Sequence, residues 1–312
     1  MQPSKSRNVT YLCALLVTIV GSTYLVTYSH FHSQIHRFLP SNSSSSSAHN
    51  SLLFSAPNDL NLTLPVLSEK DTELFARKMR KKEKERYFFL LDTLHQLSIK
   101  KNLTYFLGMG TLLGSYRHHD IVPWDDDLDL MIPVEHKAIL AQEYKNITDQ
   151  YFTPTTYNVA KISLKYGQKY LHGDGKLRYK YTFPFLDLFF YTVNKTHMLN
   201  YRHGDMRLDI IFPLNLRPLN KKLYYGPRDP HRYIATLGYS LDECYTGGYN
   251  HSGEYVRSQS DRATAPCSSL INKVPFVQHV RGPGGAWCQE VLSLGKKVLS
   301  TFARSKENIT DC

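Results

Sequence analysis

The stretch that decides the fold is GTLLGSYRHHDIVPWDDDLDLMIP, residues 110–133. Residues 111–118 can form a short helix, and residues 125–132, which open with three aspartates and continue with apolar residues around Asp129, can form a strand. Pro123 and Trp124 mark a turn between the two segments. The pattern predicts a helix, a turn and then a strand that carries acidic side chains at its start.

The acidic residues carry the chemistry. Side chains alternate between the two faces of a strand, so Asp125, Asp127 and Asp129 are expected to share one face at a spacing of about 6.6 Å, whereas Asp126 points the other way. Like charges this close repel unless a cation is present. Mg²⁺ commonly takes one or two carboxylates and leaves positions for water and phosphate oxygens. We therefore expect a site for Mg²⁺ (or Mn²⁺) rather than a solvated acidic loop.

A glycine-containing turn precedes the expected helix. Gly108, Gly110 and Gly114 surround Thr111, and small residues at a helix start let backbone N–H groups approach an anion. Gly110 and Thr111 are therefore candidates for contact with a phosphate. Arg117 could bind a phosphate bidentately or form a surface ion pair.

A further carboxylate lies in the apolar segment FPFLDLFFY, residues 183–191. An isolated ionised aspartate among such neighbours is costly to bury. Asp187 is therefore interpreted as a metal ligand, as a general base toward an acceptor hydroxyl, or as a satisfied position at a strand edge.

The rest of the chain indicates mixed secondary structure. A helix is expected over residues 71–100, with an apolar face in its second half. Further helix is expected over 134–145 and strands over 103–107, 151–157, 161–166 and 179–191. Residues 211–240 mix strand and turn signals. Helices and strands in this order indicate an α/β fold with one central sheet.

At these residues the chain resembles the LicD and fukutin-related family, whose signature GTLLG–R–IPWDDDID is similar to residues 110–133. The resemblance covers about residues 80 to 240. It implies a nucleotidyltransferase-like fold, a mixed sheet flanked by helices. It also implies transfer of a phosphorylated alcohol, such as phosphocholine or ribitol phosphate, from a CDP-activated donor to a glycan.

The resemblance also implies roles by motif position. Asp127 and Asp129 would bind Mg²⁺, Asp125 would assist them, and Asp187 would complete the catalytic and metal-binding set. Gly110 and Thr111 would contact the donor phosphates. The chain departs from the pattern in two places, which leave the carboxylates intact: Gly108-Met109-Gly110 stands where a Gly-Gly pair is frequent, and Ser115 where alanine is frequent.

The N-terminal segment predicts the compartment. Residues 11–27 are almost wholly apolar and uncharged, enough to span a bilayer, and Lys5 and Arg7 precede them. We expect a cytosolic tail at 1–8, a transmembrane signal anchor at 9–29, a Ser-rich stem at 30–68 and a lumenal catalytic domain at 69–243. This describes a single-pass type II protein of the Golgi membrane. A cleaved signal peptide is the alternative.

Sequons and cysteines agree with a secretory route. Asn-x-Ser/Thr triplets, which are glycosylation candidates, begin at Asn42, Asn61, Asn102, Asn146, Asn194, Asn250 and Asn308. Cys244, Cys267, Cys288 and Cys312 all lie in the last quarter and allow two disulfides in three connectivities. Residues 244–312 are therefore expected to be loop-rich and disulfide-stapled, with a zinc site using His251 or His279 as an alternative.

The net charge indicates which classes of binding partner to expect. The formal net charge is +11, which favours anionic partners such as phosphorylated substrates or a membrane surface. No basic tract interleaved with aromatic residues is present, so nucleic acid is not expected. Two rival functions share the acidic motif or the topology. One is a nucleotide-sugar glycosyltransferase with an Asp-x-Asp metal site, and the other is a non-enzymatic glycan-binding protein.

Overall fold

The structure is a computed structural model that describes residues 67–200, 204–282 and 287–305. The expected anchor at 9–29 and nearly all of the expected stem at 30–68 lie outside these residues. Among the described residues, no helix combines the length and the apolar character that crossing a bilayer requires. Residues 62–312 make up one compact unit.

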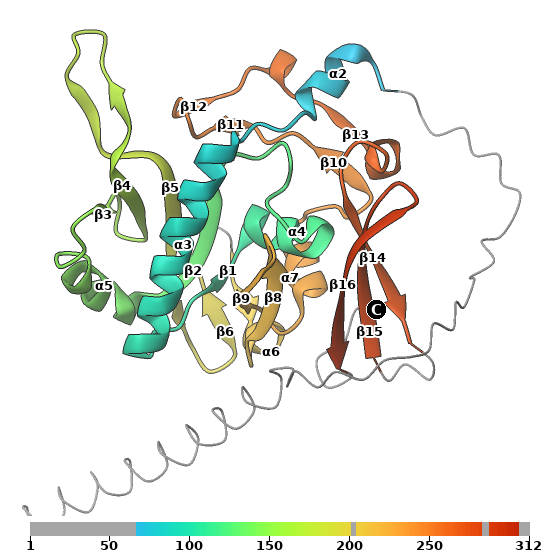
Figure 1. The fold of residues 1–312 in the computed structure, drawn as a ribbon. Helices are drawn as coiled ribbons and strands as arrows, with labels where there is room; N and C mark the ends of the chain where they lie inside the picture. The colour runs from blue at the N-terminus through green and yellow to red at the C-terminus, as the bar shows by residue number, and fades with distance from the viewer. Residues whose placement is uncertain (1–66, 201–203, 283–286, 306–312) are drawn as a thin grey trace, which may run out of the picture. The chain divides into compact units, whose positions relative to one another are not determined.

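The centre of this unit is a seven-stranded mixed sheet (Figure 1). Its main path runs in the order β1-β2-β5-β4-β3, with β6 paired to β5 and β7 to β6. Only β2 and β5 pair in parallel among these strands, and the other pairs are antiparallel. The strands are β1 (Phe106–Leu107), β2 (Leu128–Pro133), β3 (Gln150–Pro154), β4 (Val159–Leu171), β5 (Leu177–Val193), β6 (His197–Leu199) and β7 (Met206–Arg207). The expectation of a mixed sheet flanked by helices is confirmed.

Helix α3 (Lys81–Lys101) lies across one face of the sheet (Figure 1). Its expected apolar face is confirmed, because Tyr87, Leu90, Leu91 and Leu94 are all buried. The helix ends at Asn102, whose left-handed φ of 51° closes the last turn.

The single helix expected over 71–100 is wrong in its first part. Residues Glu69–Leu74 form a separate helix, α2, and the chain leaves helical geometry before α3 begins. Phe75 is 3% exposed and packs edge-on against Trp124 at 4.9 Å. The backbone N–H of Lys78 donates to the carbonyl of Pro123. These tertiary contacts hold a non-helical linker between the two helices.

Helix α4 (Met109–His118) lies in the interior of the unit. Nine of its residues are buried, including polar side chains at Thr111, Ser115 and Arg117. It follows β1 and precedes the turn into β2, as residues 110–133 predict. A helix buried on all sides fixes the position of its N-terminal turn firmly.

The C-terminal region is richer in strands than expected. Strands β14 (Phe276–Arg281), β15 (Trp287–Leu294) and β16 (Lys297–Ser305) form an antiparallel sheet (Figure 1). Glu290 of β15 is fully buried and ion-pairs with Arg217 and with His119, the C-cap residue that follows α4. Because these contacts cross position 243, the described residues after 243 pack against the same unit as the sheet.

Shorter elements complete the chain. They are η1 (Val134–His136), α5 (Lys137–Glu143), α6 (Leu208–Ile211), β8 (Asn215–Leu219), β9 (Lys222–Gly226), α7 (Pro230–Thr236), β10 (Glu243–Tyr245), β11 (Tyr249–Asn250), β12 (Tyr255–Val256), η2 (Gln259–Asp261), β13 (Thr264–Pro266) and η3 (Cys267–Leu270). A disulfide joins Cys244 to Cys267 and so ties β10 to the end of β13. Cys288 is disulfide-bonded as well.

The described sequon asparagines lie at the surface. Asn102, Asn146 and Asn194 are exposed, and Asn250 is half-buried in β11. Asn42, Asn61 and Asn308 lie outside the described residues. Glycosylation at these positions stays a prediction.

Candidate metal and phosphate site

Two of the expected site residues meet on neighbouring strands. Asp129 of β2 and Asp187 of β5 are register partners in the parallel pair, so their side chains lie next to each other on one face of the sheet. Both are buried, with exposures of 8% and 6%. Asp187 is therefore part of the acidic cluster, as the sequence predicts.

Asp125 and Asp127 reach the cluster by a different route from the one expected. Strand β2 begins only at Leu128, so the alternating-face geometry expected over 125–132 is wrong for these two residues. The backbone N–H of Asp125 donates to the carbonyl of Val122 and turns the chain ahead of the strand. The hydroxyl of Tyr87 on α3 donates to the carbonyl of Asp126 at 2.6 Å, which ties the acidic loop to that helix.

The N-terminal turn of α4 faces the same carboxylates. The backbone N–H of Asp129 donates to the Thr111 hydroxyl oxygen at 2.6 Å. A Cβ added at Gly110 would lie 3.1 Å from Asp125 Oδ2 and 3.8 Å from Asp129 Oδ2. The glycine therefore leaves open a space that a side chain would fill. Gly110 and Thr111 are brought together with the aspartates.

Arg117 takes another position. Its guanidinium is buried, lies 5.7 Å from the ring centroid of Trp124, and donates to the carbonyl of Ser240 and to His118 Nε2. Burial lowers its pKa to about 10, and the charge of Asp125 opposes that effect. Arg117 thus braces the turn that carries Asp125, and none of the hydrogen bonds or ion pairs found for it goes to an aspartate of the cluster.

Lys161 is a member of the site that the sequence did not single out. It lies on β4, opposite Asp187 of β5, and donates to both carboxylate oxygens of Asp187, at 2.8 and 3.1 Å. Its ammonium lies 3.5 Å from the ring centroid of Phe185 and 3.9 Å from Glu254 Oε1. The aromatic ring and the two carboxylates hold this charge in a buried position.

His251 is a second member of the site that the sequence does not place with the aspartates; it was expected only as an alternative zinc ligand. It comes from the segment between β11 and β12, far along the chain from the aspartates. Its Nδ1 lies 3.0 Å from Asp126 Oδ1 and its Nε2 lies 3.2 Å from Asp127 Oδ2. No local sequence signal marks this contact, because it depends on how the C-terminal region folds back.

The aspartates are costly to ionise together. Burial raises the pKa of Asp127 to about 7, with a further contribution from the charge of Asp129. Burial and the charge of Asp187 raise the pKa of Asp129 to about 7, and the pKa of Asp125 is raised well above its usual range. Burial lowers the pKa of His251, but Asp127 and Asp126 outweigh that effect and raise it to about 10.

The donor set fits a divalent cation. Among the described residues, ion pairs link three of the five aspartates, Asp126, Asp127 and Asp187, to Lys161, His251 and Arg257. Asp125 and Asp129 have no ion-pair partner in that set. Ligand atoms of Asp127, Asp187 and His251 lie within 4.8 Å of one another. An oxygen-rich cluster with surplus negative charge is what Mg²⁺ and Mn²⁺ require.

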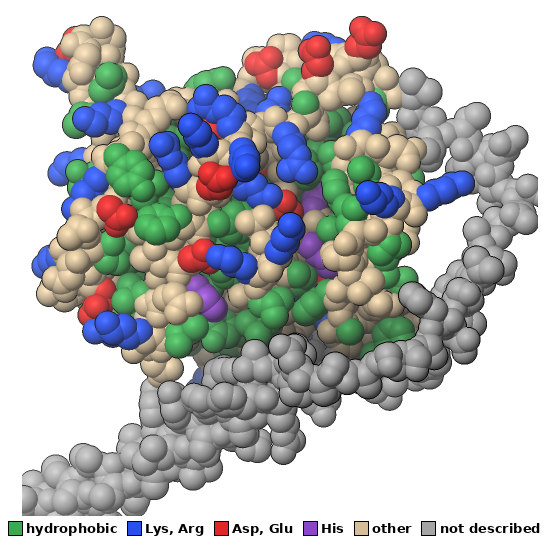
Figure 2. Space-filling model, in the orientation of Figure 1, with side chains coloured by type: hydrophobic (Ala, Val, Ile, Leu, Met, Phe, Trp, Pro, Cys, Tyr) green, Lys and Arg blue, Asp and Glu red, His purple; other side chains and the backbone are tan. Residues whose placement is uncertain are grey.

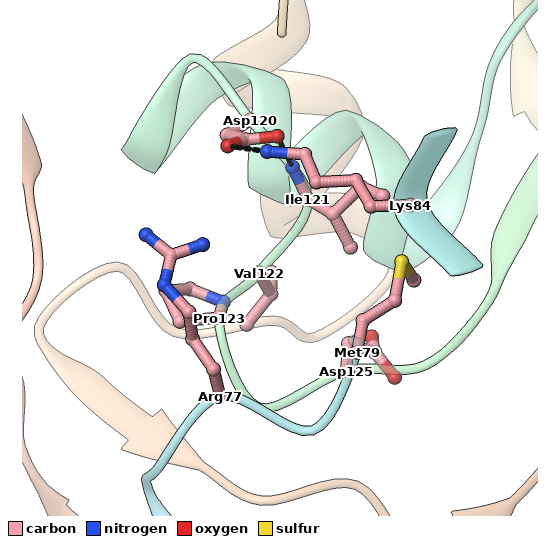
Figure 3. A pocket seen from close by; sticks show the side chains of 8 residues that line it. All are labelled: Arg77, Met79, Lys84, Asp120, Ile121, Val122, Pro123 and Asp125. Carbon is pink, nitrogen blue, oxygen red and sulfur yellow. Dashed lines mark hydrogen bonds and ion pairs between the residues drawn. The ribbon is translucent and has the colours of Figure 1, made fainter. Parts of the chain in front are cut away.

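A pocket opens beside the acidic loop (Figure 3). Its lining residues are Arg77, Met79, Lys84, Asp120, Ile121, Val122, Pro123 and Asp125. Lys84 ion-pairs with Asp120 at its rim. Figure 2 shows basic side chains gathered on the face where α3 lies, and Arg77, Arg80, Lys81 and Lys82 are exposed. Arg77 belongs both to this basic surface and to the lining of the pocket, and Asp125 lines the same pocket.

Comparison with known proteins matches this region to a family. Residues 102–229 match the family model described as LicD/FKTN/FKRP, nucleotidyltransferase domain. These residues form a LicD-family domain. The matched range contains the four expected aspartates, Gly110 and Thr111, whereas His251 lies beyond it.

Curated relatives of the LicD-family domain come from bacteria. An uncharacterized protein of Rickettsia prowazekii is 31% identical over 160 residues, which are 48% of this chain and 52% of the relative. The lipopolysaccharide cholinephosphotransferase LicD of Haemophilus influenzae is 38% identical over 66 residues, 21% of this chain and 22% of the relative. The chain therefore spans about half or less of the length of these relatives.

Among solved structures, the lincomycin-bound lincosamide adenylyltransferase LnuA matches with a TM-score of 0.30 and 13% identity, covering 51% of this chain and 97% of the other. A similarity this low supports no inference about the LicD-family domain.

Proposed function

We propose that this chain is a divalent-metal-dependent phosphotransferase. It moves a phosphorylated alcohol, of the phosphocholine or ribitol phosphate type, from a CDP-activated donor to a hydroxyl of a glycan. The observation that carries the proposal is the pairing of Asp129 with Asp187 on parallel strands, beside Gly110 at the start of α4. The LicD-family domain and its cholinephosphotransferase relative support the reaction class.

The acidic cluster provides the cation site. Asp127, Asp129 and Asp187 would hold Mg²⁺ or Mn²⁺, and such an ion would supply positive charge next to the donor phosphates. Both oxygens of Asp187 also accept hydrogen bonds from Lys161, which orients that carboxylate. The first N–H groups of α4 at Gly110 and Thr111 have no intrahelical partner and carry partial positive charge, which favours a phosphate there.

The transfer itself is one displacement at phosphorus. The acceptor hydroxyl oxygen attacks the β-phosphorus of the donor, the bond to the bridging oxygen breaks, and CMP leaves with the electron pair. The hydroxyl proton passes to a carboxylate. Asp125 suits that role, because it lines the pocket and its pKa is raised by burial and by Asp127, so it is a stronger base than an exposed aspartate.

The compartment is part of the proposal. A disulfide between Cys244 and Cys267 supports an oxidising environment. Together with the apolar run at 11–27, it supports a type II protein of the Golgi membrane with the LicD-family domain in the lumen.

A donor panel tests the reaction. The purified full-length chain is incubated with CDP-choline, CDP-ribitol, CDP-glycerol and UDP-sugars, with glycan acceptors, with and without Mg²⁺. Metal-dependent CMP release from a CDP-alcohol is expected. Turnover of a UDP-sugar alone would identify a glycosyltransferase instead, and binding of glycans without release of any nucleotide would identify a binding protein.

A further inference from the structure

His251 lies in the acidic cluster although it belongs to a different part of the chain. It follows β11 (Tyr249–Asn250) in the turn toward β12, 125 positions from Asp126. Residue 251 is outside the range that matches the family model. The aspartates alone therefore do not describe the complete set of side chains at this site.

Asp126 holds this turn by three contacts. Asp126 Oδ2 accepts hydrogen bonds from the backbone N–H groups of His251 at 3.1 Å and of Ser252 at 3.4 Å. Its Oδ1 lies 3.0 Å from His251 Nδ1. The carboxylate fixes both the backbone of the turn and the orientation of the ring.

The second ring nitrogen of His251, Nε2, faces Asp127. In the neutral ring with its hydrogen on Nδ1, donated to Asp126, the lone pair of the imidazole is on Nε2, and a cation bound there would take the place of the second ring proton. Nε2 lies 3.2 Å from Asp127 Oδ2. A carboxylate that orients one nitrogen of a histidine while the other faces a cation site is the usual arrangement around protein metal ions.

The spacing also fits. Two ligand atoms at right angles about an ion, each about 2.1 Å from it, lie about 3 Å apart. The observed separation of Nε2 from the Asp127 oxygen is 3.2 Å, and an oxygen of Asp187 completes a group within 4.8 Å. His251 and Asp127 are therefore placed as neighbouring ligands of one ion.

We propose that His251 is a metal ligand through Nε2, with Asp126 as its positioning residue, and that the site prefers a first-row transition cation such as Mn²⁺ over Mg²⁺. The proposal rests on the metal site of the proposed function. A nitrogen ligand accounts for the preference, because Mg²⁺ binds oxygen almost exclusively, whereas transition cations accept imidazole. The C-terminal region then sets which ion the LicD-family domain uses.

Pulsed electron paramagnetic resonance of the full-length chain with substoichiometric Mn²⁺ tests the assignment without an activity measurement. A ¹⁴N modulation from a directly coordinated imidazole is expected, and it should change when the protein is made with ¹⁵N-histidine. The signal should vanish in His251→Gln and persist in His172→Gln, which changes an exposed histidine in the turn after β4. Isotope labelling needs no substitution, so the test holds even if His251→Gln fails to fold.

Calorimetric titration supplies a second readout. His251→Gln should weaken Mn²⁺ binding about tenfold or more and Mg²⁺ binding much less. Bound Mn²⁺ without a coordinated nitrogen would overturn the assignment of His251 and leave the aspartate site in place. Absence of Mn²⁺ and Mg²⁺ binding would overturn the metal site itself, and with it the proposed function.

Discussion

Lys161 donates hydrogen bonds to both carboxylate oxygens of Asp187, across the β4–β5 pair. Both side chains are about nine-tenths buried. The pair therefore places one fixed positive charge inside a cluster of five aspartates, and it makes the cluster partly neutral before any ion binds.

Replacing Lys161 should make the fold depend on a cation. Lys161→Met leaves Asp187 buried without its partner and should cost about 3–5 kcal/mol of unfolding free energy in metal-free buffer. Saturating Mg²⁺ or Mn²⁺ should raise the melting temperature of the variant more than that of the wild type. Lys169→Met, an exposed position on the same strand, is the control and should behave like wild type. If the cation raised the melting temperature of both variants equally, Lys161 would not contribute to the charge balance of the metal site.

Thr111 should act through its hydroxyl oxygen. That oxygen accepts the backbone N–H of Asp129 at a fully buried position, so Thr111→Val leaves the donor unsatisfied. The expected loss is about 1–3 kcal/mol in chemical denaturation. Thr111→Ser keeps the acceptor and should lose much less. Identical stabilities of the valine and serine variants would show that this bond does not hold Asp129.

The buried Glu290 should stabilise the protein in a pH-dependent manner. Arg217, His119 and Arg304 surround it, with a 2.9 Å contact to Arg304, and although burial opposes ionisation, the two arginines and His119 lower its pKa below the usual value. Because the pKa of the folded state is lower than that of the unfolded state, the stabilisation is present above the unfolded pKa and is lost as pH falls toward the folded pKa.

Glu290→Gln tests this linkage. At pH 7 the variant should lose about 3–5 kcal/mol, because Arg217 stays buried with its charge partner removed. The difference from wild type should shrink below about pH 4.5, where Glu290 is protonated in the unfolded chain. Urea titrations at several pH values measure it. A difference that stays constant down to pH 3 would contradict the lowered pKa.

The Cys244–Cys267 disulfide should support the site as well as the fold. The carbonyl of Tyr245, next to Cys244, accepts a hydrogen bond from the indole of Trp124, which precedes the acidic loop. Replacing both cysteines by serine should cost about 3 kcal/mol, as expected for a closed loop of this size. It should also weaken Mn²⁺ binding in the same preparation. Unchanged cation affinity in the folded variant would limit the disulfide to a role in stability.

Local sequence patterns predict the parts of the site that are close in the chain. The glycine turn, α4 and the Asp129 strand follow from residues 110–133, and the apolar spacing of Tyr87 to Leu94 gives the face of α3. Asp187 was found because a charged residue stands out in an apolar strand. Each of these signals is contained within a few residues.

Contacts between distant segments were not predictable in this way. Lys161 is an ordinary lysine in a strand pattern until β4 pairs with β5, and His251 reaches the aspartates only through the fold of the C-terminal region. The C-terminal strands were hidden because β15 points the charged Glu290 inward, which breaks the apolar alternation that marks a strand.

Nucleotide release by matched aspartate variants tests the central claim most directly. The full-length chain, Asp127→Asn, Asp129→Asn and the exposed control Asp174→Asn are compared for Mg²⁺- or Mn²⁺-dependent CMP release from CDP-alcohols. Wild type and Asp174→Asn should turn over, whereas both cluster variants should fall by at least about a hundredfold while staying folded. Full turnover by a folded Asp127→Asn or Asp129→Asn protein would contradict the account.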